Sequence, residues 1–143
     1  MSTQIQHDEK VAARFMQNQG GAGGLHDFLG IKITASSTGQ MTGELEVRDE
    51  LLTPFGNMHG GVLSAFCDHM LGCVCYPAMK PGQWAATTEF KINLTAPVST
   101  GTVTAKANII SMSRTQSVVR IDVSNEGRLA AVAQGTVTIR DPR

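Results

Sequence analysis

The sequence lacks several features that would mark particular classes of protein. Lysine plus arginine and aspartate plus glutamate number 12 each, so the 143-residue chain has no net charge, and no basic run occurs. Nucleic-acid-binding proteins usually carry a basic patch, so we expect no nucleic-acid partner. No apolar run approaches the roughly 18 residues of a membrane span, and the first ten residues are polar. We therefore expect a soluble, cytoplasmic protein with no membrane partner.

The chain also lacks the even cysteine count of a disulfide framework. Its three cysteines, Cys67, Cys73 and Cys75, all fall in one apolar segment, which predicts reduced, buried thiols. Cys73 and Cys75 would point about 200° apart on a helix, and the adjacent Asp68 and His69 diverge. We therefore expect no metal site.

The length suits one domain, which we expect to span residues 1–143. Residues 7–18 place apolar side chains at helical spacing, and the glycine-rich stretch 19–24 ends that pattern. Residues 1–24 are therefore predicted to form an N-terminal helix followed by a flexible joint.

Alternating apolar and polar residues predict six strands. Residues 31–35 and 43–47 flank a turn at 36–39 and form a first hairpin, and the later strands lie at 84–94, 102–112, 116–124 and 128–140. In the strand 84–94, alternation predicts one face made of Ala86, Thr88, Phe90, Ile92 and Leu94. The many small residues on the predicted inner faces favour a sheet that curls tightly around a helix.

One long helix is predicted between the hairpin and the later strands. Residues 62–76 are apolar on most sides, and Pro77 follows, so we expect a helix that is buried nearly all round. A strand pair, a central helix and four consecutive antiparallel strands make an α+β architecture in which the sheet wraps the helix.

The start of this helix carries the most informative pattern in the chain. Gly60 and Gly61 follow His59, and the carboxylate of Asp68 lies on the same helix, where we expect apolar neighbours to hold it. Glycine permits close approach of a ligand, and the first helical turn leaves backbone N–H groups unpaired. The pattern is typical of a site that binds an oxyanion or a thioester carbonyl.

The spacing between the two groups has a geometric consequence. Gly60 and Asp68 are eight residues apart, which is roughly 12 Å along one helix. An oxyanion donor and a nucleophile must both lie about 3 Å from one carbon atom. A two-fold dimer with antiparallel helices solves this problem, and the small Ser64, Ala65 and Gly72 would permit close approach. The sequence thus predicts an obligate dimer with two equal sites.

The His59-Gly60-Gly61 tripeptide, the carboxylate at Asp68 and the order of elements from residue 28 onward resemble the PaaI-like family of hotdog acyl-CoA thioesterases. The resemblance implies a hotdog fold and hydrolysis of acyl-CoA thioesters to free acid and CoA at a dimer interface. It also implies that dimers often pair into tetramers. Coenzyme A belongs to the substrate, so no separate cofactor is expected.

The resemblance implies roles for the residues of the motif. The Gly60 N–H polarises the thioester carbonyl, while Asp68 attacks it or activates a water molecule. Gly61 and His59 adjoin the site, and His59 either hydrogen-bonds the turn or takes part directly. Relatives have Asn or Gln six residues before the histidine; Thr53 stands there in this chain, and Asn57 is the candidate to compensate.

Two further matches lie beyond the helix. Thr87 matches a hydroxyl residue that assists the carboxylate in relatives, although alternation groups its side chain with Glu89, away from the apolar face. The loop Ser113, Arg114 and Thr115 matches a segment near the coenzyme A nucleotide, and an arginine suits phosphate binding.

Several alternatives remain open at this point. The glycine pair can simply form a tight helix entry, with Asp68 paired to a cation. A hotdog hydratase or dehydratase would use His59 and Asp68 as acid and base. A non-catalytic dimer that binds acyl-CoA is favoured by Thr53, where relatives carry an amide.

Overall fold

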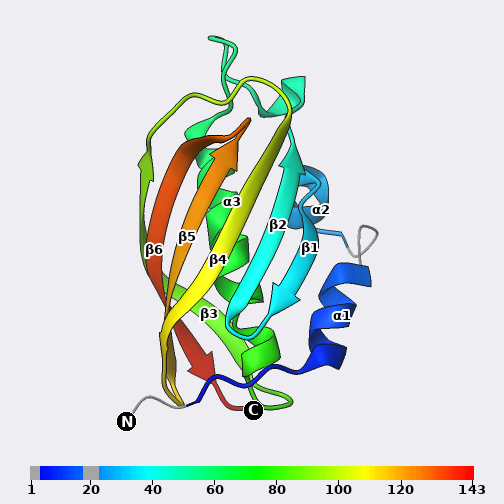
Figure 1. The fold of residues 1–143 in the computed structure, drawn as a ribbon, viewed down its shortest axis with the longest axis vertical. Coiled ribbons are helices and arrows are strands. Elements are labelled where there is room, and N and C mark those ends of the chain that lie inside the picture. Colours follow the sequence, from blue (N-terminus) through cyan, green and yellow to red (C-terminus); the bar gives the residue numbers. More distant parts are fainter. Residues whose placement is uncertain (1–3, 18–22) are drawn as a thin grey trace.

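The computed structural model describes residues 4–17 and 23–143. A curved antiparallel sheet surrounds one face of the long helix α3, and the helices α1 and α2 lie beside β1 (Figure 1). The elements, in chain order, are α1 (Glu9–Gln17), α2 (Leu25–Leu29), β1 (Lys32–Ser37), β2 (Gln40–Glu46), the 3-10 turn η1 (Asp49–Leu51), α3 (Gly60–Cys73), the 3-10 turn η2 (Tyr76–Ala78), β3 (Trp84–Leu94), β4 (Thr102–Met112), β5 (Gln116–Asn125) and β6 (Arg128–Arg140). None of the helices in these described ranges has the length and apolar character to cross a membrane.

The sheet has the strand order β1-β2-β4-β5-β6-β3, with every neighbouring pair antiparallel. Small and β-branched residues cover its inner face, among them Val103, Ala105, Ala107, Ile121 and Ala133, which are all buried. These short side chains let the sheet curl closely around α3. The predicted α+β architecture is confirmed, and it is the hotdog arrangement that the resemblance implied.

Gly43 shows how closely α3 approaches the sheet. A Cβ atom on this residue of β2 would lie 2.7 Å from the Met70 sulfur and 3.2 Å from the Phe66 ring. Both side chains are fully buried. Only glycine therefore allows α3 to pack at this distance.

Most predicted boundaries agree with the structure. The strands at 84–94, 102–112 and 128–140 have the predicted limits, and β5 runs one residue further than expected, to Asn125. The predicted N-terminal helix is observed as α1 up to Gln17, while residues 18–22 of that helix and joint lie outside the described part of the chain. The short elements α2 and η1 were not predicted.

Two predictions about the central helix are wrong. The helix begins at Gly60 and ends at Cys73, and a separate 3-10 turn follows at Tyr76–Ala78. Its burial is also one-sided, since the buried side chains are those of Leu63, Phe66, Cys67, Met70, Leu71 and Cys73. The sheet covers only that side, and Asp68 on the other side is exposed in the single chain. Apolar neighbours therefore do not enclose the carboxylate as expected.

The predicted face of β3 is also wrong in its first half, because the strand contains a β-bulge. Thr87 pairs with Val137 of β6, but Glu89 pairs with the preceding Thr136, so Thr88 is an extra residue. The extra residue reverses the alternation of side chains. Thr87 therefore shares the inner face with Phe90, whereas Thr88 faces outward and its hydroxyl contacts that of Thr138.

Pairing along β6 assigns the remaining side chains of β3. Residues that lie directly opposite in an antiparallel pair point to the same face of the sheet. Ala85 pairs with Ile139, which is buried, while Ala86 pairs with Thr138. Ala85 and Thr87 thus replace Ala86 and Thr88 on the inner face.

Candidate active site

The N-terminus of α3 is closed by His59. The Gly61 N–H donates a 2.9 Å hydrogen bond to His59 Nδ1, and the His59 N–H donates to the Leu51 carbonyl at 2.9 Å. His59 is thus the N-cap residue of the helix and satisfies one of its free N–H groups. Hydrogen-bonding the turn, one of the two roles considered for His59, is thus observed. The Gly61 N–H is not free for a ligand.

The Gly60 N–H differs from that of Gly61, because it has no acceptor among the described residues. A Cβ atom on Gly60 would lie 2.7 Å from Leu94 Cδ1 of β3, so the backbone and that side chain are in close contact. Gly60 and Asn57 both line a cavity of about 280 Å³ between the start of α3 and the segment 94–98. An unpaired donor at a helix N-terminus is well suited to an oxyanion.

Asn57 is held by Thr53, the residue at the position where the resemblance led us to expect an amide. The Thr53 hydroxyl donates to Asn57 Oδ1 at 3.2 Å, and the Thr53 N–H donates to the Asn57 carbonyl at 2.7 Å. The side-chain oxygen of Asn57 is therefore occupied, which leaves its NH₂ group available as a donor.

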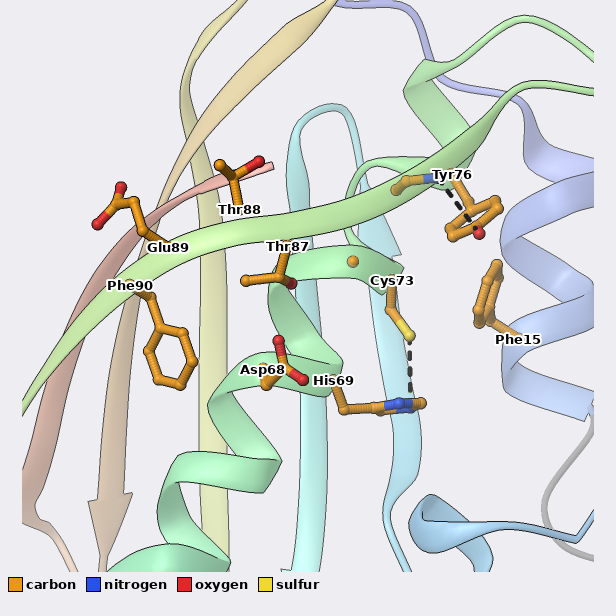
Figure 2. Close-up of a pocket in the computed structure, with 11 residues that line it drawn as sticks. Phe15, Asp68, His69, Cys73, Tyr76, Thr87, Thr88, Glu89 and Phe90 are labelled. Atoms are coloured by element: carbon orange, nitrogen blue, oxygen red, sulfur yellow. Dashed lines mark hydrogen bonds between the residues drawn. The ribbon is translucent and has the colours of Figure 1, made fainter. Parts of the chain in front are cut away.

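Asp68 and Thr87 lie in a second and larger cavity of about 880 Å³ between α3, β3 and α1. The Asp68 carboxylate points toward Thr87, and the Phe90 ring lies beside them (Figure 2). Within the described ranges Asp68 forms no ion pair. The structure therefore does not support the alternative of a carboxylate that is paired to a cation.

His69 borders the same cavity, and sequence reasoning missed it. Its ring stacks on that of His26 with centroids 5.1 Å apart and planes 5° apart, and its Nε2 lies 3.3 Å from Cys73 Sγ. Burial lowers the pKa of His69 below its ordinary 6.5, and the neighbouring His26 lowers it further. The ring is thus neutral at pH 7. The spacing of His69 and Cys73, four residues apart on one helix, was the available signal.

The three cysteines are buried, as expected. Burial raises the pKa of Cys67 and Cys73 to about 12 and that of Cys75 to about 11, so all three remain protonated thiols at neutral pH. Across the described residues no cluster of three His, Cys, Asp or Glu side chains has the geometry to hold a metal ion.

The loop at 113–115 lines neither of these two cavities. Ser113 and Arg114 border a third cavity of about 250 Å³, together with Lys80. Arg114 is exposed and its Nη1 lies 3.4 Å from Asp141 Oδ2, while the Thr115 N–H donates to Ser113 Oγ at 3.4 Å.

The predicted site residues thus fall into separate groups within one chain. Gly60 and Asn57 share one cavity and Asp68 and Thr87 share another, with eight residues of α3 between the glycine and the carboxylate. The structure does not bring the donor and the acid together in a single chain.

The chain is similar in sequence to known proteins. The sequence profile of the thioesterase superfamily matches residues 55–132, which is more than half of the chain. A putative esterase of Haemophilus influenzae is 30% identical over 115 residues, covering 78% of this chain and 81% of that protein. A 1,4-dihydroxy-2-naphthoyl-CoA hydrolase of Listeria monocytogenes is 27% identical over 121 residues, covering 84% and 98%.

Solved structures share the fold. A crystal structure of a thioesterase from Haemophilus influenzae superposes with a TM-score of 0.85 at 23% identity, covering 97% of this chain and 96% of that one. The PaaI protein from the phenylacetic acid degradation operon of E. coli gives a TM-score of 0.81 at 22% identity, with 92% of each chain covered.

Proposed function

This chain belongs to the thioesterase superfamily and is a thioester hydrolase, and we propose that it hydrolyses acyl-CoA thioesters to the free acid and CoA. One observation carries the proposal. A single helix has an unpaired N–H at Gly60 and, eight residues later, an unpaired carboxylate at Asp68. These are the two groups that thioester hydrolysis requires. The related CoA hydrolase of Listeria monocytogenes supports coenzyme A as the thiol.

The reaction centre is formed by two chains, as a homodimer or a dimer of dimers. Roughly 12 Å of helix separate the two groups within one chain, and a two-fold axis would place Gly60 of the partner subunit beside Asp68. The free edge of β3 supports such an association, because this strand pairs only with β6 among the described strands. Two large apolar side chains of β3, Trp84 and Leu94, are exposed.

The chemistry follows from this arrangement. The Gly60 N–H, aided by the helix dipole, donates to the thioester oxygen as it gains negative charge. Asp68 either removes a proton from the attacking water or attacks the carbonyl itself. A new C–O bond forms, the C–S bond breaks, and the CoA thiolate leaves and takes up a proton. If Asp68 itself attacks, the new bond is that of a mixed anhydride, and a water molecule then cleaves it to release the acid and restore the carboxylate. The Thr87 hydroxyl, which shares this cavity with Asp68, is our candidate hydrogen-bonding partner for the carboxylate or the water.

Other residues have supporting roles. Asn57, held by Thr53, supplies the side-chain amide that the family resemblance leads us to expect at the position of Thr53. Arg114, with Ser113 and Thr115, binds the phosphates of the CoA nucleotide, and Lys80 at the same cavity adds positive charge. Coenzyme A arrives as part of the substrate, so the proposal needs no separate cofactor. The three buried thiols suit a reducing compartment, which supports a cytoplasmic location.

Two earlier alternatives lose their support. A hydratase would use His59 and Asp68 as acid and base, but the matched family is one of thioesterases and a related protein is a CoA hydrolase. A non-catalytic binding protein was favoured by the missing amide at Thr53. The side-chain amide of Asn57, which Thr53 holds by a hydrogen bond, is our candidate replacement, and the family is one of hydrolases.

Release of free thiol from a panel of acyl-CoA esters tests the reaction. We expect Asp68→Asn to lower kcat/KM by roughly two to four orders of magnitude. Asp122→Asn is the matched control, because that carboxylate is exposed and paired with Arg120 at 3.2 Å on β5. Full activity of Asp68→Asn would refute the proposed role of the carboxylate.

Mixed dimers test the shared site. Co-expression of Asp68→Asn chains with Gly60→Pro/Leu94→Ala chains yields heterodimers in which one site keeps both native groups. We expect each variant alone to be inactive and the mixture to recover about a quarter of the native activity. If donor and acid came from one chain, every site in the mixture would carry a defect and no recovery would occur.

A further inference from the structure

Gly72 lies one helical turn after Asp68 on α3 and borders the same cavity. A Cβ atom built on Gly72 would meet no atom within 4 Å, and its φ is not positive. Neither packing nor backbone conformation in this chain therefore requires glycine here. Glycine inside a helix is nevertheless less stable than alanine, so its presence calls for another explanation.

Two other glycines differ from Gly72, because a Cβ atom on either of them would collide with a side chain of the same chain. A Cβ atom on Gly43 would lie 2.7 Å from the Met70 sulfur, and one on Gly60 would lie 2.7 Å from Leu94 Cδ1. Both of these glycines are needed for close packing within the chain. Gly72 keeps a volume open instead.

The open volume beside Gly72 lies close to the Asp68 carboxylate. Four residues of helix place Gly72 roughly 6 Å beyond Asp68. Tyr76 and Phe15, with ring centroids 5.6 Å apart, line the cavity beyond Gly72, and Phe90 lines it from β3. The volume is thus apolar on several sides and begins about one helical turn from the carboxylate.

A partner helix does not explain Gly72. In an antiparallel pair that brings Gly60 of the partner subunit to Asp68, continuing the helical rise would set Gly72 at the level of Gly56 of the partner subunit. That position comes four residues before the helix α3 begins. The partner's α3 would therefore not cross Gly72, and the close approach of helices for which the sequence suggested Gly72 would not need a glycine at this level.

We propose that Gly72 determines acyl specificity by leaving room for bulk close to the thioester carbonyl. The preferred acyl groups then carry a branch or a ring within a few atoms of that carbonyl, and short straight chains do not use the space. This inference rests on the proposed function, since it assigns the volume above Gly72 to the acyl group of the substrate.

Graded substitution tests the inference. Gly72→Ala, Gly72→Val and Gly72→Leu are assayed with acetyl-CoA and butyryl-CoA as straight-chain esters and with isobutyryl-CoA and benzoyl-CoA as bulky ones. We expect kcat/KM for benzoyl-CoA to fall about tenfold or more, increasingly along the series. We expect kcat/KM for acetyl-CoA to fall less than that for benzoyl-CoA in every variant, and Gly72→Ala to raise Tm by a few degrees.

Gly43→Ala is the matched control. The same substitution at that glycine meets the Met70 sulfur, so we expect it to lower Tm and to leave the ratio of kcat/KM values between bulky and straight-chain esters unchanged. The opposite signs of the two Tm shifts separate a loss of packing from a loss of substrate space.

Two results would overturn the inference while leaving the hydrolase assignment intact. One is a set of Gly72 variants with kcat/KM reduced equally for all esters, and the other is dissociation of the dimer by Gly72→Ala. If the native protein cleaves none of the esters, the proposed function fails separately. Binding of intact benzoyl-CoA and acetyl-CoA to Asp68→Ala and to Asp68→Ala/Gly72→Val then decides the inference. Equal dissociation constants for benzoyl-CoA in the two proteins would refute it.

Discussion

Thr87 of β3 pairs with the fully buried Val137 of β6, and this pairing turns the Thr87 side chain toward the cavity that holds Asp68. The β-bulge at Thr88 makes this pairing possible. Without the extra residue, the alternation of side chains counted back from Phe90 would turn Thr87 to the outer face. A hydroxyl group therefore lies beside the carboxylate, where simple alternation placed it on the opposite face.

Thr87→Val tests whether this hydroxyl serves the reaction. The substitution keeps the β-branched shape and removes one hydrogen-bonding group, so we expect kcat/KM to fall roughly tenfold. The free energy of unfolding should change by less than about 1 kcal/mol. Thr138→Val is the control, because Thr138 does not line this cavity and its hydroxyl contacts that of Thr88. Equal losses of activity in both variants would show that the position of the hydroxyl does not matter.

The Gly60 N–H can be removed without breaking the helix. Gly60 is the first residue of α3, where proline is well tolerated, and the extended conformation of His59, with φ −60° and ψ 131°, accommodates a following proline. In a Leu94→Ala background, which removes the steric clash, we expect Gly60→Pro to lower kcat by about two to three orders of magnitude. Gly60→Ala in the same background retains the N–H and should remain active. Steady-state kinetics of the pair isolates the contribution of the donor.

The stability of the protein should depend on pH through His69. Its pKa in the folded chain is lowered from 6.5 by burial and by His26, with Asp68 opposing. As the pH falls below about 6.5, the unfolded chain gains the proton first, so the free energy of unfolding decreases until the folded-state pKa is reached. Urea unfolding at pH 7.5 and pH 5.5 measures the loss. His69→Gln should show a smaller loss, and an unchanged pH dependence in that variant would contradict the assignment.

The cysteines should resist modification and destabilise the fold at high pH. The pKa values of Cys67 and Cys73 are raised from 9.0 to about 12, so the unfolded chain loses these protons first as the pH rises above about 9. Stability therefore falls from about pH 9 upward. Alkylation by iodoacetamide at pH 8, followed by mass spectrometry, should be slow in the folded protein and rapid in 6 M urea. Rapid modification of the folded protein would contradict the buried, protonated state.

Strong local patterns made most of the fold predictable from sequence. Long alternating runs gave the limits of β3, β4 and β6, and Pro77 and the glycine pair marked the region of α3. The five-residue helix α2 was missed because so short a segment carries no clear periodicity. The one-sided burial of α3 was missed because glycine, alanine and serine fit an exposed helix face as readily as a core.

Some residues of the candidate site could be predicted from the sequence, and others could not. Asp68 and Gly60 stood out because an acid in an apolar helix and a glycine at its start have few purely structural uses. The inward position of Thr87 was not predictable, since nothing in the run Ala85 to Thr88 marks which residue is the extra one in the strand. The His26–His69 stack joins two helices and requires tertiary structure to be seen.

The bulge in β3 also divides the strand into two segments, and the alternation of inward and outward side chains in one segment does not fix the alternation in the other. The side chains before Thr88 and those after it are therefore oriented independently. A one-residue insertion or deletion confined to the first segment would turn the Thr87 side chain to the other face of the sheet and leave Phe90 in place. Homologous proteins whose strands differ in length by one residue can therefore place a different side chain beside the catalytic carboxylate without a change of fold. Alignments of such chains should accordingly admit a gap at this point rather than match the threonines by position.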